Sequence, residues 1–180
     1  MGFALCVFCG SGLGARPEFA AAAKELGAEI GRRGWTLVYG GGHVGLMGVV
    51  ADAALASGAR VVGVIPRFLH DKEVAHGGLS ALEIVTSFAE RKQRMGELSD
   101  AFLSLPGGVG TLDELFEAWS WTQAGLQRKP SGLLSVEGYF DDLVRFIDRA
   151  AAEGFIRPDS RAVLKVASDV AALLDALERG

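Results

Sequence analysis

The chain has 180 residues, of which 49% are hydrophobic and 25 are glycine. This length fits one α/β domain, expected to span residues 1–180, that buries its apolar surface without disulfides or metals. No apolar run approaches the ~20 residues that cross a bilayer. The formal charge of −4 includes no basic block. A membrane role and a nucleic-acid partner are therefore not indicated.

The N-terminal segment reads as a buried strand. Residues 3–9 are apolar, and they lead into glycines without a preceding basic region, which is not typical of an export signal. A cytoplasmic location is the expectation. Cys6 and Cys9 form a C-x-x-C, the spacing of redox pairs and of half a zinc site. Their odd separation in a strand points the thiols to opposite faces, and the three histidines lack metal-ligand spacing, so no metal is predicted.

Strands and helices alternate along the rest of the chain. Pro17 lies near the start of a helix that Gly34 ends. A small-residue helix ends near Ser57, and residues 67–80 read as a polar loop. The other predicted elements are strands at 35–39, 59–66, 81–85, 101–106 and 131–136, helices at 87–98, 108–123 and 139–154, and a short strand and closing helix within 162–178, with Ser168 as its N-cap.

This alternation predicts a parallel sheet with helices on both faces, a Rossmann-like α/β fold. In such sheets ligands bind in the crevice at the carboxyl ends of the strands. Three glycine-rich stretches follow predicted strands, at 10–14, 40–48 and 107–110. All three are expected to face the same crevice.

The stretch LPGGVGTLDEL, residues 105–115, carries the strongest binding signal. A helix N-terminus offers unpaired N–H donors and a partial positive charge, and glycine lets an anion approach the backbone. The Thr111 hydroxyl adds a donor, so the stretch is suited to a phosphate. Residues 111–114 also satisfy the S/T-x-x-E capping box, which needs no ligand. The residues alone leave both interpretations open.

Binding of a dinucleotide is an alternative interpretation of the glycine-rich stretches, because GSGLGA at 10–15 and GGGHVG at 40–45 fit G-x-G-x-x-G/A. The next strands end in Tyr39 and Pro66, without the acidic residue that binds a ribose. Arg67 is the one residue there suited to a 2′-phosphate.

Several motifs together resemble a known family. PGGVGTLDE at 106–114, ERK at 90–92, VFCGS at 7–11 and YGGGHVGLMG at 39–48 resemble the LONELY GUY (LOG) family of cytokinin riboside 5′-monophosphate phosphoribohydrolases, over about residues 3–178. Its members have often been labelled lysine decarboxylases. The resemblance implies a homodimeric hydrolase, without metal or cofactor, that splits the N-glycosidic bond of an N6-modified adenosine monophosphate and releases the base and ribose 5-phosphate.

The resemblance also implies site residues. It places the catalytic pair at Arg91 and Glu114. Two departures concern base recognition: Phe88-Ala89 stands where the family commonly has Met-His, and Val109 stands where it has an aromatic residue. The implied substrate contacts are Glu73, Arg91, Lys92, Gly108, Val109, Gly110, Thr111, Leu112, Asp113 and Glu114.

The chemistry assigns a role to each member of the pair. Glycosidic cleavage passes through an oxocarbenium-like sugar, which a carboxylate stabilises, and Glu114 lies one turn inside the phosphate-binding helix. Asp113 points ~100° away and is expected to face solvent. Arg91 offers a fork of donors for phosphate or carboxylate, and Lys92 adds charge. The alternative is that Arg91, Lys92 and Arg94 form the exposed face of an amphipathic helix. The core side of that helix is then Phe88, Met95 and Leu98.

Two other functions remain open at this stage. One is a nucleotide or cofactor carrier that binds without hydrolysis. The other is a decarboxylase using pyridoxal phosphate, which needs a lysine in the pocket, and of the five lysines only Lys92 falls near the crevice. Helical spacing favours a role in the core or in a dimer face for Leu112, Leu115, Phe116 and Trp119. Trp119 and Trp121 are also compatible with a homodimer interface.

Overall fold

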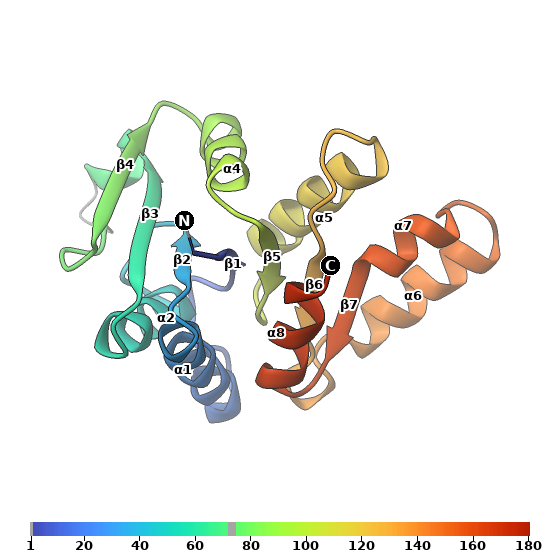
Figure 1. The fold of residues 1–180 in the computed structure, drawn as a ribbon, viewed down its shortest axis with the longest axis horizontal. Coiled ribbons are helices and arrows are strands. Elements are labelled where there is room, and N and C mark those ends of the chain that lie inside the picture. Colours follow the sequence, from blue (N-terminus) through green and yellow to red (C-terminus); the bar gives the residue numbers. More distant parts are fainter. Residues whose placement is uncertain (1, 72–74) are drawn as a thin grey trace.

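The structure, a computed structural model, describes residues 2–71 and 75–180. Its described part forms one sheet of seven parallel strands flanked by helices (Figure 1). The strands are β1 (Ala4–Phe8), β2 (Thr36–Tyr39), β3 (Arg60–Pro66), β4 (Ala81–Val85), β5 (Ala101–Ser104), β6 (Ser131–Leu134) and β7 (Leu164–Ala167). The helices are α1 (Pro17–Arg32), α2 (Gly45–Ala56), α3 (Arg67–His70), α4 (Phe88–Glu97), α5 (Val109–Gln123), the 3₁₀ turn η1 (Val136–Gly138), α6 (Asp141–Ala152), α7 (Pro158–Val163) and α8 (Val170–Glu178).

The strand order is β4-β3-β2-β1-β5-β6-β7. The chain builds outward from β1 to β4, then returns to the other side of β1 with β5, where Leu5 lies opposite Ala101. The order therefore reverses between β1 and β5. The carboxyl ends of these two strands mark the switch point at which doubly wound sheets bind ligands.

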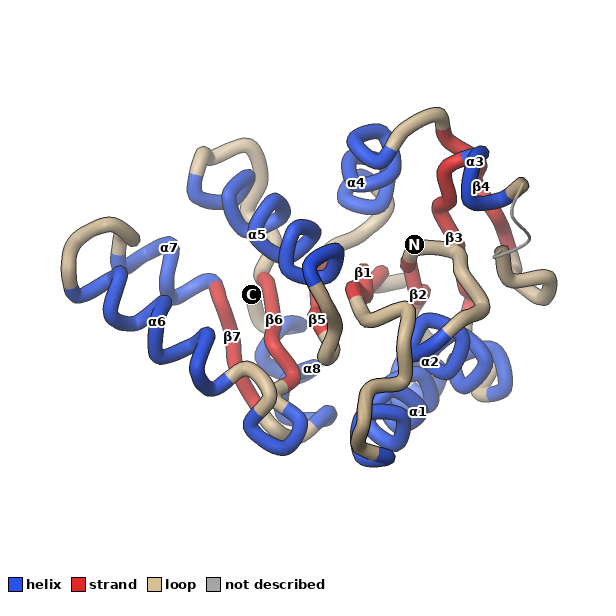
Figure 2. Tube along the Cα trace, turned by 180° about the vertical axis from the view of Figure 1, so that it is seen from behind, coloured by secondary structure: helices blue, strands red, loops and turns tan. Residues whose placement is uncertain are grey.

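Helices cover both faces of the sheet, as the two opposite views show (Figures 1 and 2). On one face Cys9 belongs to a core cluster with Leu26 of α1 and Val50 of α2. On the other, Cys6 lies in a cluster with Met95 of α4. The predicted Rossmann-like α/β fold is confirmed, and the two thiols of the C-x-x-C lie on opposite faces, as their spacing indicated.

Three local predictions were wrong. The predicted loop at 67–80 contains α3 and a bridge between Ala75 and Gly42. The helix α7 was not predicted, because six residues are too few for a periodic pattern, although Pro158 marks its start. The closing helix α8 is capped by Asp169, whose carboxylate accepts from the Ala172 N–H at 2.8 Å, and not by Ser168.

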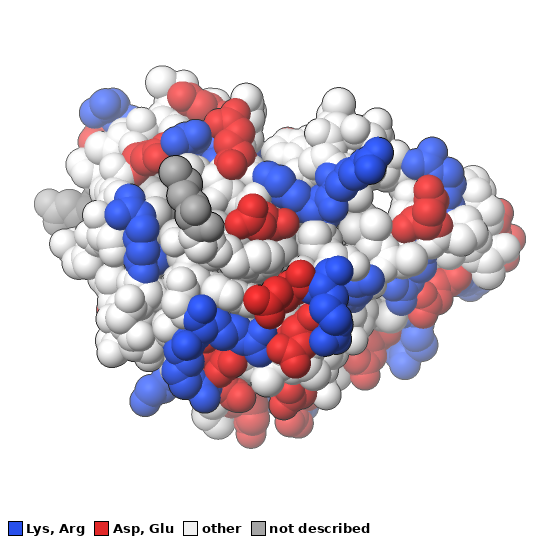
Figure 3. All heavy atoms as spheres, viewed as in Figure 1, with Lys and Arg blue, Asp and Glu red and all other residues white. Residues whose placement is uncertain are grey.

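Two features are absent from residues 2–71 and 75–180. Among these residues no helix has the length and apolar character needed to cross a bilayer. Nor do they contain a group of three or more histidine, cysteine or acidic side chains arranged to hold a metal ion. On the face shown in Figure 3, acidic and basic side chains are interspersed. That face does not present the single-sign surface typical of nucleic-acid binding.

The helices α1 and α2 approach each other closely at Gly27 and at Gly31 of α1. A Cβ placed on Gly27 would lie 2.4 Å from the Val50 carbonyl oxygen and 2.8 Å from the Ala53 Cβ. Contact at this distance is possible only without a side chain. Because α2 starts at the crevice, this packing also sets the position of residues that line it.

We expect Gly27→Ala to lower the free energy of unfolding by about 1 to 3 kcal/mol, although alanine is the better helix former, because overpacking outweighs helix propensity. Urea denaturation measures the change. Glu25→Ala, on the exposed side of α1, is the matched control and should shift stability by less than ~0.5 kcal/mol. A stabilised Gly27→Ala protein would show that the two helices are not in close contact.

Candidate active site

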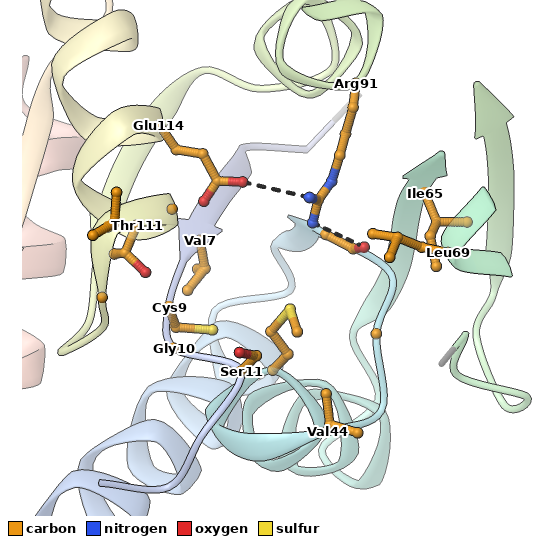
Figure 4. Close-up of a pocket in the computed structure, with 16 residues that line it drawn as sticks. Val7, Cys9, Gly10, Ser11, Val44, Ile65, Leu69, Arg91, Thr111 and Glu114 are labelled. Atoms are coloured by element: carbon orange, nitrogen blue, oxygen red, sulfur yellow. Dashed lines mark hydrogen bonds and ion pairs between the residues drawn. The ribbon is translucent and has the colours of Figure 1, made fainter. Parts of the chain in front are cut away.

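A cavity of about 430 Å³ opens at the switch point, within the size range of small-ligand pockets. Members of all three glycine-rich stretches line it, which confirms that they face one crevice (Figure 4). The lining residues are Val7, Cys9, Gly10, Ser11, Gly40, Gly42, Val44, Met47, Ile65, Leu69, Arg91, Gly108, Val109, Gly110, Thr111 and Glu114.

The N-terminus of α5 opens into this cavity. Gly108 is the N-cap and offers no side-chain hydrogen bond, while the Leu112 N–H already donates to the Gly108 carbonyl at 3.1 Å. The preceding N–H groups of the first turn have no partner within the helix. Thr111 is buried inside α5 and lines the cavity. The capping-box interpretation is therefore wrong, because Thr111 does not occupy the cap position.

Arg91 of α4 is buried, with only 9% of its surface exposed. Its Nε donates to the Val64 carbonyl and its Nη2 to the Gly40 carbonyl, both at 3.1 Å. A Cβ on Gly40 would lie 1.8 Å from Nη2, so the guanidinium occupies space that only a glycine leaves free. The interpretation of Arg91 as an exposed helix face is wrong, and Phe88, expected in the core, is half exposed.

The carboxylate of Glu114 faces this guanidinium across the cavity (Figure 4). Its Oε1 lies 3.8 Å from Arg91 Nη1, and 14% of the Glu114 side chain is exposed. Burial raises the pKa of Glu114 to about 7, and the positive charge of Arg91 opposes that rise only in part. The structure thus brings together the two residues that the resemblance named as catalytic.

Several other predicted contacts lie at the rim of the cavity or away from it. Lys92 pairs with Asp113 at 2.9 Å and with Glu117, so neither it nor Asp113 lines the pocket. Asp113 is exposed, as its direction on the helix indicated. Leu112 packs against the core cluster between α5 and α6, while Val109 stands 86% exposed at the rim. The predicted contact Glu73 lies outside the described residues.

The apolar part of the lining was missed by the sequence reasoning. Val7, Cys9 and Ile65 lie at or near the carboxyl ends of β1 and β3, and Val44 and Met47 lie at the start of α2. These lining residues could have been predicted from the rule that ligands bind at the carboxyl ends of parallel strands. Burial raises the pKa of the Cys9 thiol, which therefore stays protonated in this cavity.

The fold and the cavity define a class: doubly wound α/β proteins with a helix N-terminus and an acid–arginine pair facing one cavity at the switch point. The family model described as "Possible lysine decarboxylase" matches residues 47–177. A rice (Oryza sativa subsp. japonica) protein, probable cytokinin riboside 5′-monophosphate phosphoribohydrolase LOGL1, is 47% identical over 97% of this chain and 78% of its own. Arabidopsis thaliana cytokinin riboside 5′-monophosphate phosphoribohydrolase LOG7 is 45% identical over 97% and 80%. The chain belongs to the LOG family.

Solved structures share the fold at lower identity. The molybdenum cofactor binding protein from Rippkaea orientalis superposes with a TM-score of 0.76 and 22% identity, covering 99% of this chain and 97% of that one. The molybdenum cofactor carrier protein from Chlamydomonas reinhardtii gives 0.75 and 21%, covering 99% and 98%. At these identities the likeness establishes the fold.

The raised pKa of Glu114 predicts a pH-dependent stability. The pKa of this carboxyl is 4.5 in the unfolded chain and about 7 in the folded protein. Between these two pH values the carboxyl is mostly protonated in the folded protein and mostly ionised in the unfolded chain. Unfolding then releases a proton, so rising pH favours unfolding. From about pH 5 to about pH 8 the unfolding free energy should fall by on the order of 3 kcal/mol relative to that of Glu114→Gln. Urea denaturation of both proteins across this range tests it, and parallel pH profiles would contradict it.

Proposed function

We propose that this protein hydrolyses the N-glycosidic bond of cytokinin riboside 5′-monophosphates, releasing the free base and ribose 5-phosphate. Relatives at 45–47% identity over nearly the whole chain bear that activity in their names. The observation that carries the proposal is the position of the Arg91–Glu114 pair, in one cavity with the N-terminus of α5.

The helix N-terminus is suited to the 5′-phosphate. Backbone N–H groups at 109–111 and the Thr111 hydroxyl supply donors, and the helix dipole favours the negative charge. Glu114 projects from the same helix one turn further on. A phosphate bound at the N-terminus would bring the attached ribose within reach of the Glu114 carboxylate.

The carboxylate supplies what the reaction needs. As the bond from C1′ to the base nitrogen breaks, positive charge develops on the sugar, and an ionised Glu114 stabilises it. Water adds its hydroxyl to C1′ while its proton is transferred, through Glu114 acting as base, toward the departing base. With a pKa of about 7, Glu114 can both accept and release a proton near neutral pH. Arg91, fixed by two carbonyls, holds the carboxylate in place.

The apolar lining is suited to a purine. Ile65 and Leu69 lie on the far side of Arg91 from Glu114 (Figure 4), and Val44 and Met47 extend the nonpolar surface. A flat base carrying an N6 hydrocarbon group buries apolar area against these side chains. The base-recognition end of the cavity is thus separate from the phosphate end.

A pyridoxal phosphate decarboxylase fits the cavity poorly. Such chemistry needs a lysine amine inside the pocket, and no lysine lines it among residues 2–71 and 75–180. The amine of Lys92 is held by Asp113 and Glu117 outside it.

The cellular location, the oligomeric state and a further substrate contact are also proposals. We propose a cytoplasmic enzyme that acts on a small nucleotide as a homodimer, with Glu73 as a further substrate contact. Trp119 does not support a dimer face, because it is buried and its indole N–H donates to the Ser160 carbonyl at 2.8 Å. Trp121 and the exposed Leu126 border a groove beside α4 and are better placed for that role.

Glu114→Gln should lower kcat for N6-isopentenyladenosine 5′-monophosphate by about 10²- to 10⁴-fold, because it removes the base and the negative charge while keeping the shape. The measurement is chromatographic release of free base, with nucleotide binding followed by calorimetry. Binding should be retained.

The control is Glu25→Gln on the exposed side of α1, away from the cavity, which should retain wild-type kcat. Nucleotide binding by a wild-type protein that releases no base would instead support a carrier. Equal turnover in Glu114→Gln and wild type would remove Glu114 from the mechanism.

A further inference from the structure

Tyr139, which precedes α6, contacts the loop that begins α5. Its hydroxyl donates to the Gly107 carbonyl at 2.6 Å, across 32 residues of sequence. The neighbouring Pro106 carbonyl accepts from the Gly10 N–H at 3.1 Å. Two successive carbonyls of this loop are therefore held by groups from other elements, directly before the N–H groups suited to phosphate.

The backbone of this loop borders open space on two sides. Gly108 borders the 430 Å³ cavity on one side. Pro106, Gly107 and Gly108 also border a second hollow of about 350 Å³, which Phe19 and Tyr139 help to line. Pro106 is buried and Gly107 packs closely against Thr111, whereas Gly108 is exposed. The hydroxyl of Tyr139 supplies a fixed bond at this point.

The turn that carries Tyr139 is itself held in an unusual conformation. Glu137 has φ 51° and ψ 34°, a left-handed backbone that is uncommon for a residue other than glycine, and Gly138 follows at φ 71°. Ser135 fixes this turn, since its hydroxyl donates to Asp141 at 2.8 Å and accepts from the Phe140 N–H at 3.1 Å. Such conformations persist where the surroundings enforce them and cluster at functional sites.

Aromatic contacts complete the placement of the side chain. The Tyr139 ring meets Phe19 edge-on at 5.6 Å and Phe140 at 5.0 Å. Phe140 is buried in the core, while Tyr139 is 45% exposed. The ring is thus fixed from both sides although much of it faces solvent. Burial alone does not account for so constrained a tyrosine.

We infer that Tyr139 is a positioning residue for the phosphate end of the site: its hydroxyl holds the Gly107 carbonyl so that the N–H groups at the start of α5 point to the 5′-phosphate. The inference rests on the proposed function. Because the phosphate is bound equally before and during cleavage of a bond remote from it, the residue acts on affinity and leaves the chemical step unchanged.

The test is Tyr139→Phe, which removes the hydroxyl and keeps the ring on Phe19 and Phe140. Calorimetry with ribose 5-phosphate reports on the phosphate end of the site, and calorimetry with adenine reports on the base end. Ribose 5-phosphate should bind about three- to tenfold more weakly, the effect of one lost hydrogen bond, while adenine binds as to wild type. With the nucleotide substrate, KM should rise by the same factor at unchanged kcat.

Tyr39→Phe is the matched control, since it deletes the hydroxyl of the other tyrosine, which is buried and lacks a hydrogen-bond partner within the described residues. It should leave ribose 5-phosphate binding unchanged. Wild-type affinity for ribose 5-phosphate in Tyr139→Phe, equal weakening of adenine, or a fall in kcat alone would overturn the inference. Failure of wild type to release base would refute the proposed function, while the calorimetric comparison would still decide the role of Tyr139.

Discussion

The buried guanidinium of Arg91 is the contact on which the site depends. It binds the carbonyls of Val64 and Gly40, at the carboxyl ends of β3 and β2, and faces Glu114 on the other side of the switch point. A buried charge is costly unless hydrogen bonds and an opposite charge compensate it. One side chain therefore couples the two halves of the sheet, and the requirement for glycine at position 40 follows from the space that it occupies.

The same burial gives Glu114 its chemical character. A carboxylate removed from water is harder to ionise, and the nearby positive charge offsets only part of that effect, so the pKa rises to about 7. One turn earlier on the same helix, the N-terminus of α5 presents backbone donors and no acidic side chain. The cavity thus has a titratable carboxyl at one point and backbone donors at another.

The fold alone does not select this chemistry. Proteins that carry the molybdenum cofactor share the same architecture at 21–22% identity, in keeping with the rule that function resides in particular side chains placed on a common scaffold. Here those side chains come from α4 and α5, which pack on the sheet face opposite to α1 and α2. The glycine loops after β1, β2 and β5 expose backbone to the crevice, and α4 and α5 place the Arg91–Glu114 pair in it.

Local sequence determined the alternation of strands and helices, the parallel sheet, and the meeting of three glycine-rich loops at one edge, because periodicity and glycine act within a few residues. Only the tertiary structure decided which side of α4 is buried. Helical spacing grouped Arg91 with Lys92 and Arg94, yet packing against β3 buried Arg91 and left Phe88 half exposed. It likewise decided that Thr111 lines a cavity and that Lys92 pairs with α5. A pattern along one helix defines its faces, but the partner of each face depends on contacts between residues distant in the chain.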